Sequence, residues 1–513
     1  MLRSSFAKNI GSNWILLAMN VAISFVLSPF VVNKLGSVYY GIWAIAMQFT
    51  GYLYLMDFGV RESVIRYTSK YAVRQQARSL NQVLSASLLL YLPITIGCIL
   101  LALLCAWLAP SIFDIPETHV TETRLAVIFV GLTIAQTFVF NVFTGIQHGL
   151  NRFFISNVTG MAMTILRTVL IVVMLSLGYK LVALAAIQFG VAILGGIICM
   201  WQAIRSLRLA GTPLKLELPG RRRFTALRRK ILGYGFYVLV NNIAQKINFT
   251  SDAIVIGIFL PVSSVTPYAI AGSLVDYLRS LIMSTAQIFN PLSSALYTQR
   301  RPEDLIRLLI RGSKLTVVVT SPIALTYAIL GDTFVGLWMG PEYAASAGAV
   351  LLVLGITQLV SAPHYVVASV LYGMSKHRAM GFLRVGEAAA NLTLSIILVQ
   401  KMGIVGVALG TAISHFVVVL ALLPSLIKQL VGVSITRYFM GTYARALVAS
   451  IPFALGAFWI RLNWQARNLL EFFAQVAVLC ILYGLSVLAI GLDKEERQTM
   501  LKPLTRRLAK DSA

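Results

Sequence analysis

The sequence is poor in charged residues. Only 12% of its 513 residues are charged, whereas about 25% is usual in soluble proteins. Hydrophobic residues make up 58% of the chain, and they are gathered in runs of some 20 residues that are long enough to cross a bilayer. The scarcity of charge excludes an ordinary soluble enzyme and predicts an integral membrane protein.

Residues that build disulfides and metal sites are also few. The four cysteines all lie in apolar runs, and none belongs to a Cys-x-x-Cys pair: Cys98, Cys105, Cys199 and Cys480. The five histidines are scattered along the chain, and no His/Cys group has metal-ligand spacing. We therefore expect buried, unmodified cysteines, no metal site and no cofactor, apart from a coupling Na⁺ or H⁺.

Acidic residues are scarce relative to basic ones. The chain has 18 Asp and Glu against 43 Lys and Arg, a formal net charge of +25. In a soluble protein this excess would indicate nucleic acid, but here the basic residues flank the apolar runs. Their position favours a role in membrane topology and in contacts with anionic lipids. No nucleic-acid partner is expected.

The alternation of apolar and polar residues typical of a membrane β-barrel is missing, so the spans should be helices. We expect an all-α polytopic protein with about fourteen transmembrane helices. These spans are Ile10–Val32, Val38–Phe58, Val83–Leu108, Leu125–Ile146, Phe154–Leu177, Leu181–Ile204, Ile231–Leu260, Tyr268–Leu296, Leu315–Leu330, Ala347–Tyr372, Ala379–Leu398, Ile404–Ile427, Leu447–Ile460 and Leu469–Ile490.

The distribution of charge tests this number of spans. If both termini are cytoplasmic, most of the 43 basic residues fall on the cytoplasmic side, as the positive-inside rule requires. Only six fall in outer segments: Lys34, Arg124, Lys180, Lys401, Arg461 and Arg467. A missed helix would destroy this asymmetry, so both termini are predicted to lie in the cytoplasm.

The two halves of the chain resemble each other at a nearly constant offset. A shift of 228 positions places Asn13 on Asn241 and Asn20 on Asn248. We therefore expect two six-helix lobes related as parallel repeats, residues 1–204 and 231–430. A basic cytoplasmic linker, residues 205–230, joins them, and residues 431–513 add two further helices and a cytoplasmic tail.

Polar side chains recur on single faces of several spans. The seventh span carries a stripe of amides and one acid, with a lysine beside it: Asn241, Gln245, Lys246, Asn248 and Asp252. The eighth span carries Asp276, Arg279 and Gln287 on one face, the eleventh carries Arg384, Glu387 and Asn391, and the first carries Asn13 and Asn20. A charged group at membrane depth is costly, so these faces should meet a water-filled cavity or polar partners.

These faces give the candidate site. The basic residues inside spans, Lys246, Arg279, Arg384 and Arg167, are candidates for binding an anionic substrate. The acids Asp252, Asp276 and Glu387 are candidates for binding a coupling Na⁺ or H⁺, and the amides would line the cavity. Two structural roles compete with this site: the amides could hold helices together, and the charges could form pairs within one helix, Asp276 with Arg279 and Arg384 with Glu387.

Three segments carry a family resemblance. They are Leu35-Gly-Ser-Val-Tyr-Tyr-Gly-Ile-Trp43, Tyr54-Leu-Met-Asp-Phe-Gly-Val60 with Arg66-Tyr67, and Leu371-Tyr-Gly-Met-Ser-Lys-His-Arg378. The first two resemble the N-terminal signature of bacterial polysaccharide flippases, and the third is similar to the junction of the family's tenth and eleventh helices. These flippases belong to the multidrug/oligosaccharidyl-lipid/polysaccharide exporter superfamily, with Wzx-type O-antigen flippases as the most similar group.

The resemblance implies a V-shaped, alternating-access transporter in the bacterial cytoplasmic membrane, and not an enzyme. Its substrate would be a polyprenyl-pyrophosphate-linked oligosaccharide, a repeat unit of O-antigen, capsule or exopolysaccharide. The resemblance also implies basic residues near the pyrophosphate and polysaccharide assembly proteins as candidate partners.

Three other functions compete with this one. An ion-coupled exporter of drugs or organic cations from the same superfamily should have a net acidic cavity, whereas here the basic residues inside spans outnumber the acids. A membrane glycan polymerase or ligase should carry catalytic groups on a long outer loop, and the longest expected outer loops, 109–124 and 331–346, are short. A scaffold without transport activity is the third.

Overall fold

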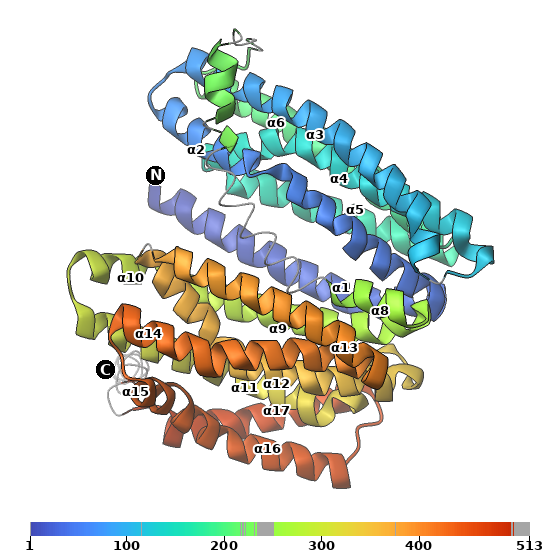
Figure 1. Ribbon diagram of the computed structural model, residues 1–513, viewed down its shortest axis with the longest axis vertical. Coiled ribbons are helices and arrows are strands. Elements are labelled where there is room, and N and C mark those ends of the chain that lie inside the picture. Colours follow the sequence, from blue (N-terminus) through green and yellow to red (C-terminus); the bar gives the residue numbers. More distant parts are fainter. Residues whose placement is uncertain are drawn as a thin grey trace, which may run out of the picture. The chain divides into compact units, whose positions relative to one another are not determined.

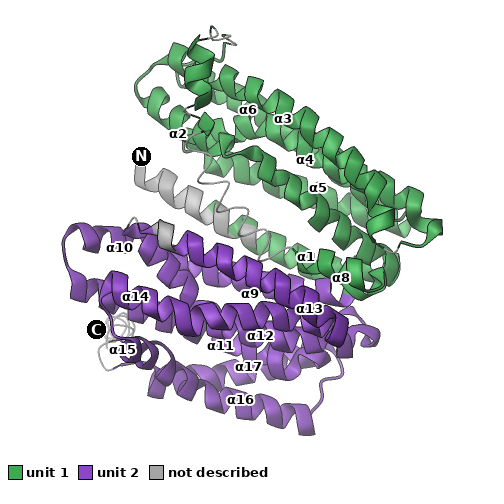
Figure 2. Cartoon of the chain, viewed as in Figure 1, with its two compact units in different colours: residues 1–266 green, residues 267–513 purple. Residues whose placement is uncertain are grey.

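The computed structural model describes residues 2–113, 115–215, 217, 220, 222–229, 231–232, 251–374, 376–493 and 496. For residues 2–11, 13, 14, 17 and 377–379 it describes the backbone alone. This described part is built of helices and contains no strand, which confirms the all-α fold (Figure 1). The chain divides into two compact units, residues 1–266 and 267–513 (Figure 2).

Unit 1 is a bundle of long helices. Its elements are α1 (Leu2–Gly51), η1 (Tyr52–Asp57), α2 (Val60–Val73), α3 (Ala77–Ile112), η2 (Glu117–His119), α4 (Val120–Gly149), α5 (Phe153–Ser176), α6 (Leu181–Leu209), α8 (Asp252–Phe259) and η3 (Val262–Ser264). Helix α4 packs against both α3 and α6, and these three helices lie side by side in Figure 1.

Unit 2 begins within α9 (Val265–Gln287). The following elements are α10 (Phe289–Thr298), α11 (Pro302–Met339), α12 (Pro341–Gly373), α13 (His377–Val417), η4 (Val418–Leu422), α14 (Leu423–Val431), α15 (Ile435–Phe439), η5 (Met440–Ala444), α16 (Arg445–Asn463), α17 (Leu469–Ser486) and η6 (Val487–Gly491). Helices α11 and α12 share the most extensive helix contact in this unit.

Two of the long helices are pairs of helices joined at a glycine. Gly36 in α1 has φ 77° and Gly403 in α13 has φ 58°, values that only glycine adopts readily. Each break falls where the sequence separates two expected spans, the first from the second and the eleventh from the twelfth. A glycine in the left-handed region therefore reverses the chain without an intervening loop.

Ten helices of the described chain are long and apolar enough to cross a membrane. Two of the ten, Ala18–Asp57 and Met380–Val431, each combine parts of two expected spans. The eighth expected span corresponds to α9 and α10, and most of the seventh lies outside the described residues. The structure thus confirms a polytopic helical membrane protein.

The division between the units follows the seventh expected span rather than preceding it. The end of that span, α8, packs on α1, and so does η3. The hydroxyl of Thr266 also donates a 2.6 Å hydrogen bond to the carbonyl oxygen of Ser37. These contacts attach residues 252–266 to unit 1, whereas the sequence divides the lobes at the basic linker, residues 205–230. That assignment of lobes stays a prediction.

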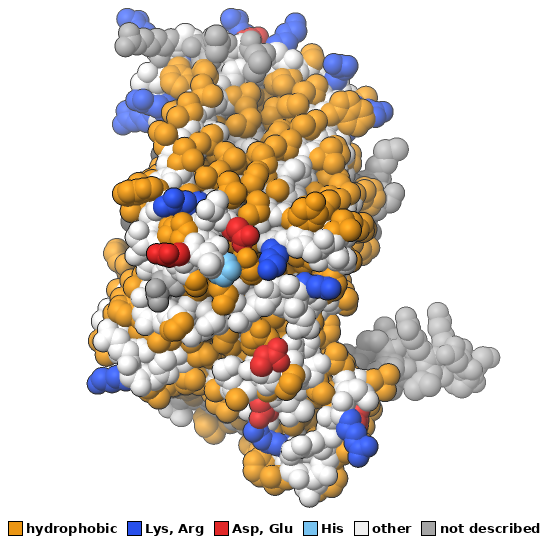
Figure 3. All heavy atoms as spheres, turned by 90° about the vertical axis from the view of Figure 1, so that its right-hand side faces the viewer, with side chains coloured by type: hydrophobic (Ala, Val, Ile, Leu, Met, Phe, Trp, Pro, Cys, Tyr) orange, Lys and Arg blue, Asp and Glu red, His pale blue; other side chains and the backbone are white. Residues whose placement is uncertain are grey.

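The surface is that of a protein in lipid. Large apolar side chains are widely exposed, for example Val26 at 75%, Phe382 at 81% and Leu470 at 82%, and Figure 3 shows hydrophobic side chains spread over one face. In water such exposure would promote aggregation, whereas in a bilayer lipid chains cover it.

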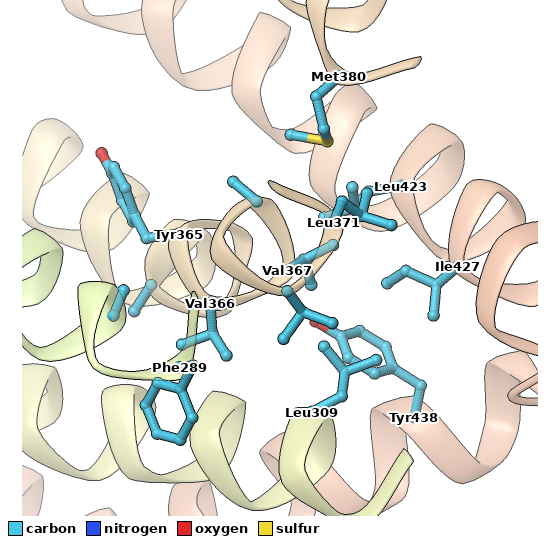
Figure 4. Close-up of a cluster of buried hydrophobic side chains, with 14 of the residues drawn as sticks. Phe289, Leu309, Tyr365, Val366, Val367, Leu371, Met380, Leu423, Ile427 and Tyr438 are labelled. Atoms are coloured by element: carbon cyan, nitrogen blue, oxygen red, sulfur yellow. The ribbon is translucent and has the colours of Figure 1, made fainter. Parts of the chain in front are cut away.

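Unit 2 has an apolar core formed by α9 to α15. Phe289, Leu309, Val367, Leu371 and Ile427 pack together in it, as Figure 4 shows. Tyr365 of α12 belongs to this core and also faces the charged residues described next. The core thereby fixes the part of α12 that borders the candidate site.

Candidate functional site

A polar region of unit 2 is built on the two halves of α13. The chain reverses at Gly403, so residues before the break face residues after it. Glu387 Oε1 lies 2.9 Å from Nδ1 of His415, and both side chains are buried, at 4% and 7% exposure. This close contact joins the eleventh and twelfth expected spans.

The same hairpin continues as a ladder of polar contacts. One turn beyond Glu387, the side-chain oxygen of Asn391 accepts hydrogen bonds from Ser395 at 3.0 Å and from Thr411 at 3.3 Å. Asn391 is fully buried. The absence of a side chain at Gly410 allows this close approach, because a Cβ there would lie 2.6 Å from Oγ of Ser395. The spacing of four residues keeps each polar group on the inner face of the hairpin.

Helix α9 contributes an ion pair within one turn. The guanidinium of Arg279 donates to the carboxylate of Asp276, three residues earlier, as the sequence pattern indicates. The arginine side chain is 17% exposed and the aspartate side chain 57%. Arg279 is therefore the more enclosed partner.

Helix α12 connects these groups. Tyr365 lies within electrostatic reach of the Asp276–Arg279 pair and also of Arg384 and Glu387. Its neighbour His364 lies within reach of Glu387, Arg384 and His415. We call these seven residues the unit 2 cluster: Asp276, Arg279, His364, Tyr365, Arg384, Glu387 and His415.

The unit 2 cluster brings together four of the residues selected from the sequence: Arg279, Arg384, Asp276 and Glu387. It adds two histidines, His364 and His415, which the sequence analysis set aside as scattered. Each histidine lies one helical turn after a polar residue, His415 after Thr411 and His364 after Ser361, and therefore shares a polar face with it. This pattern was the only sign of the histidines that the sequence contained. Spacing along one helix does not reveal that the two histidines meet across helices.

The other predicted residues are not members of this cluster. Gln287, at the end of α9, is exposed. In unit 1, Arg167 is half-buried on α5, Asp252 is buried at the start of α8, and Asn20 accepts a 3.2 Å hydrogen bond from Thr164. The predicted lining residues Asn241, Gln245, Lys246 and Asn248 lie outside the described residues, as does the side chain of Asn13. The roles proposed for all these residues stay predictions.

Unit 1 contains a second polar cluster that the sequence analysis missed. The second expected span continues beyond its predicted end: η1 leads through Phe58 and Gly59, both with positive φ, into α2. Asp57 lies at this interruption, where its carboxylate accepts a 2.5 Å hydrogen bond from the hydroxyl of Tyr91 and a 3.5 Å contact from the amide of Asn141. Interrupted helices inside membrane proteins commonly carry binding groups.

A base accompanies this acid. Arg61, in the first turn of α2, lies within electrostatic reach of Asp57 and points its guanidinium at Nδ1 of His148, 3.5 Å away. Helix α2 lies close against α4 because Gly149 has no side chain, since a Cβ there would be 2.6 Å from Cβ of Thr68. The sequence analysis did not predict α2, because the apolar run that ends at Phe58 gives no sign of a continuing helix.

A cavity of about 230 Å³ lies between α4, α5 and α6, beside this second cluster. Asn141, which contacts Asp57, lines it together with the neutral polar side chains of Gln136, Thr137, Thr144, Ser156 and Thr159. The rest of the lining is apolar and includes Phe140 and Met163, so this is a largely apolar cavity that carries a few amide and hydroxyl groups.

The fold of the chain is that of the multidrug/oligosaccharidyl-lipid/polysaccharide exporter superfamily. The structure is similar to that of lipid II flippase MurJ in an inward closed conformation, with a TM-score of 0.68 at 16% identity, over 96% of this chain and 100% of that one. It is also similar to an inward-facing multidrug resistance MATE family transporter of that superfamily, with a TM-score of 0.62 at 14% identity, over 77% of this chain and 95% of that one. At these identities the likeness shows the fold alone.

The sequence comparison gives the family. Residues 6–297, more than half of the chain, match the model of the polysaccharide biosynthesis protein family, and the chain belongs to that family. This confirms the resemblance carried by the segments at Leu35–Trp43 and Tyr54–Val60.

Two curated relatives agree with this assignment. The uncharacterized membrane protein EpsK of Bacillus subtilis is 21% identical over 515 residues, which cover 97% of each chain. The probable low-salt glycan biosynthesis flippase Agl15 of Haloferax volcanii is 23% identical over 189 residues, which cover 37% of this chain and 40% of the relative.

Proposed function

We propose that this protein is a flippase that moves a lipid-linked glycan across the cytoplasmic membrane by alternating access. Its membership of the polysaccharide biosynthesis family carries the proposal. The fold shared with a lipid II flippase and the name of one relative, a glycan biosynthesis flippase, support it. The finer proposal is a polyprenyl-pyrophosphate-linked repeat unit of O-antigen, capsule or exopolysaccharide as the substrate.

The unit 2 cluster supplies the chemistry that this substrate needs. A pyrophosphate is an anion with planar arrays of acceptor oxygens, and the forked guanidinium of arginine matches that geometry. Arg279 and Arg384 are the two arginines of the cluster, and Arg167 and Lys246 remain further candidates. No bond of the substrate needs to be broken for translocation, so none of these residues is assigned a catalytic role.

The drug-exporter alternative has the same fold, because the MATE structures are similar to this chain. Family membership argues against it. The balance of charge is less decisive than the sequence implies, since the unit 2 cluster contains two arginines and two carboxylates. A polymerase or ligase is disfavoured because the relative Agl15 is named as a probable flippase and the similar structures are those of a flippase and a transporter.

A reconstituted translocation assay tests the proposal. The purified protein is placed in vesicles with a fluorescent undecaprenyl-pyrophosphate-linked hexose, and a membrane-impermeant quencher reports how much of the lipid has reached the outer leaflet. We expect protein-dependent movement of this lipid and none of an organic cation such as ethidium. Transport of ethidium without movement of the lipid would support the drug exporter instead.

Orientation is the second testable part of the proposal. Both termini should lie in the cytoplasm of the producing cell, because basic residues then gather on that side. Reporter fusions after Arg78, Arg223 and Arg311 should therefore report the cytoplasm, and fusions near Glu117 and Glu342 the outer side. Reversed signals at any two of these positions would contradict the fourteen-span topology.

A further inference from the structure

The cavity in unit 1 lies where the helices around it diverge. Helix α5 is held against α1 by hydrogen bonds from Asn157 to Ser12, at 2.9 Å, and from Thr164 to Asn20, at 3.2 Å. Helix α4 packs closely on α6 but touches α5 only briefly. The space of about 230 Å³ between α4, α5 and α6 is therefore a consequence of how these helices pack.

Two glycines of α6 shape one wall of this cavity. A Cβ at Gly196 would clash with the ring of Phe140, and a Cβ at Gly195 would lie 3.0 Å from the side chain of Met163. Glycine at both positions thus lets these two side chains lie directly against the backbone of α6. Phe140 supplies an aromatic surface that this packing holds in place.

Helix α4 presents its polar groups to the cavity on one face. Side chains at three- and four-residue intervals line it: Gln136, Thr137, Phe140, Asn141 and Thr144. The hydroxyls of Thr137 and Thr144 donate to backbone carbonyl oxygens of α4, at 2.7 and 3.3 Å, so their lone pairs remain for a ligand. The side-chain oxygen of Gln136 is buried and has no hydrogen-bond partner among the described residues. This face therefore offers acceptors, which match a ligand rich in hydroxyl groups.

The size and charge of the cavity restrict what it can bind. Pockets that enclose drug-sized ligands have volumes of about 300–1,000 Å³, so this smaller one suits a single ring rather than a whole glycan repeat unit. None of the described residues that line it is charged, so a charged ligand group would lose its water there without gaining an ionic partner. The ligand should therefore be neutral. Most of the lining side chains are half-buried, which leaves the cavity accessible.

A sugar ring meets these conditions better than a lipid chain or water. Its hydroxyl groups can donate to the acceptors of α4, and its C–H bonds can pack against Phe140, because the face of an aromatic ring is weakly negative. A lipid chain would leave the oxygen of Gln136 without a partner, which is unfavourable for a buried acceptor. Ordered waters need about two to four polar partners each, whereas most of this lining is apolar.

We propose that this cavity is a sugar-recognition subsite, which takes one neutral monosaccharide ring of the lipid-linked glycan. Gln136 and Thr144 accept hydrogen bonds from its hydroxyl groups, and Phe140 packs against the ring. The inference rests on the function proposed above. It assigns selection among glycans to unit 1, whereas Arg279 and Arg384, proposed for the pyrophosphate that such substrates share, belong to unit 2.

Two substitutions remove the proposed contacts without adding charge. Gln136→Leu replaces the amide by an apolar side chain of similar size, and Thr144→Val replaces the hydroxyl by a methyl group. Each should weaken binding of a sugar-bearing lipid about tenfold, because a sugar hydroxyl then loses its partner. Gln188→Leu on α6 and Thr168→Val on α5 are the matched controls, since both residues lie outside the lining of the cavity.

The first measurement needs no lipid-linked substrate. Saturation-transfer NMR is applied to the full chain in lipid nanodiscs with the methyl glycosides of glucose, galactose, mannose, N-acetylglucosamine and glucuronic acid. We expect a signal from at least one neutral glycoside and none from the glucuronide, whose carboxylate finds no ionic partner in the cavity. Gln136→Leu should remove the signal, and Gln188→Leu should keep it. No signal from any neutral glycoside, or a signal that Gln136→Leu leaves unchanged, would overturn the subsite.

The second measurement compares two lipids of equal charge. One is undecaprenyl pyrophosphate linked to the neutral sugar with the strongest signal, and the other is linked to a cyclohexyl ring, which has no hydroxyl groups. The unaltered protein should bind the sugar-bearing lipid at least about tenfold more tightly, because a site built for hydroxyl groups rejects an analogue that lacks them. Gln136→Leu should remove most of this difference. If the side chain only supports the fold, this variant should weaken binding of both lipids equally.

The two measurements also keep this inference distinct from the proposed function. Binding of both lipids with equal affinity would overturn the sugar subsite and leave the flippase proposal standing. Binding of neither lipid, together with a glycoside signal that depends on Gln136, would overturn the flippase proposal and leave a neutral-sugar site established.

Discussion

Arg384→Ala should abolish translocation of the pyrophosphate-linked lipid by the purified protein, and Arg279→Ala should do the same. In the proposed site each guanidinium donates charge-assisted hydrogen bonds to the pyrophosphate. Losing such a contact costs on the order of 2–5 kcal/mol where the pair is desolvated, and less where water enters. Lysine at either position should restore transport only in part, because a point charge lacks the planar fork.

Controls determine whether these arginines act on the substrate or on their neighbours. Arg301→Ala changes an exposed arginine that pairs with Asp304, and it should leave transport unchanged. The double variant Arg279→Ala, Asp276→Ala removes both partners of the ion pair on α9. Full transport in this double variant would show that Arg279 only neutralises Asp276, and the pyrophosphate assignment would fail for that residue.

The sequence predicts the helical class well because membrane spans are determined by composition. Every backbone polar group in lipid must be hydrogen-bonded within the protein, so a long apolar run without strand-like alternation is stable in the membrane as a helix. Even the two glycine breaks agree with the sequence, since Gly36 and Gly403 fall between expected spans. Periodicity on one helix also selected four members of the unit 2 cluster.

What the sequence does not reveal is contact between helices. Glu387 and His415 are 28 positions apart, and their pairing depends on how the hairpin closes at Gly403.

The cluster around Asp57 in unit 1 was not predicted for a different reason. An apolar run ends at Phe58, yet α2 continues into the bundle because glycines on α4 leave room for it. Both cases depend on packing, which a single sequence does not display.

That second cluster leads to the last prediction. Asp57→Ala should strongly reduce the amount of folded protein and its thermal stability. The substitution leaves the hydroxyl of Tyr91 without its 2.5 Å acceptor and removes the carboxylate that offsets the charge of Arg61. Both side chains are only partly buried, so the cost should be below the roughly 3–5 kcal/mol of a fully buried charge pair and closer to about 1–3 kcal/mol, the cost of one lost buried hydrogen bond.

Companion variants divide this cost between the two partners. Tyr91→Phe removes only the hydroxyl donor and should cost about 1–3 kcal/mol. Tyr179→Phe, at an exposed tyrosine, is the matched control and should have no measurable effect. Adding Arg61→Met to Asp57→Ala should recover much of the lost stability, because no unbalanced charge then remains. Thermal unfolding in detergent measures all four variants, and a double variant no more stable than Asp57→Ala alone would show that Arg61 does not depend on Asp57.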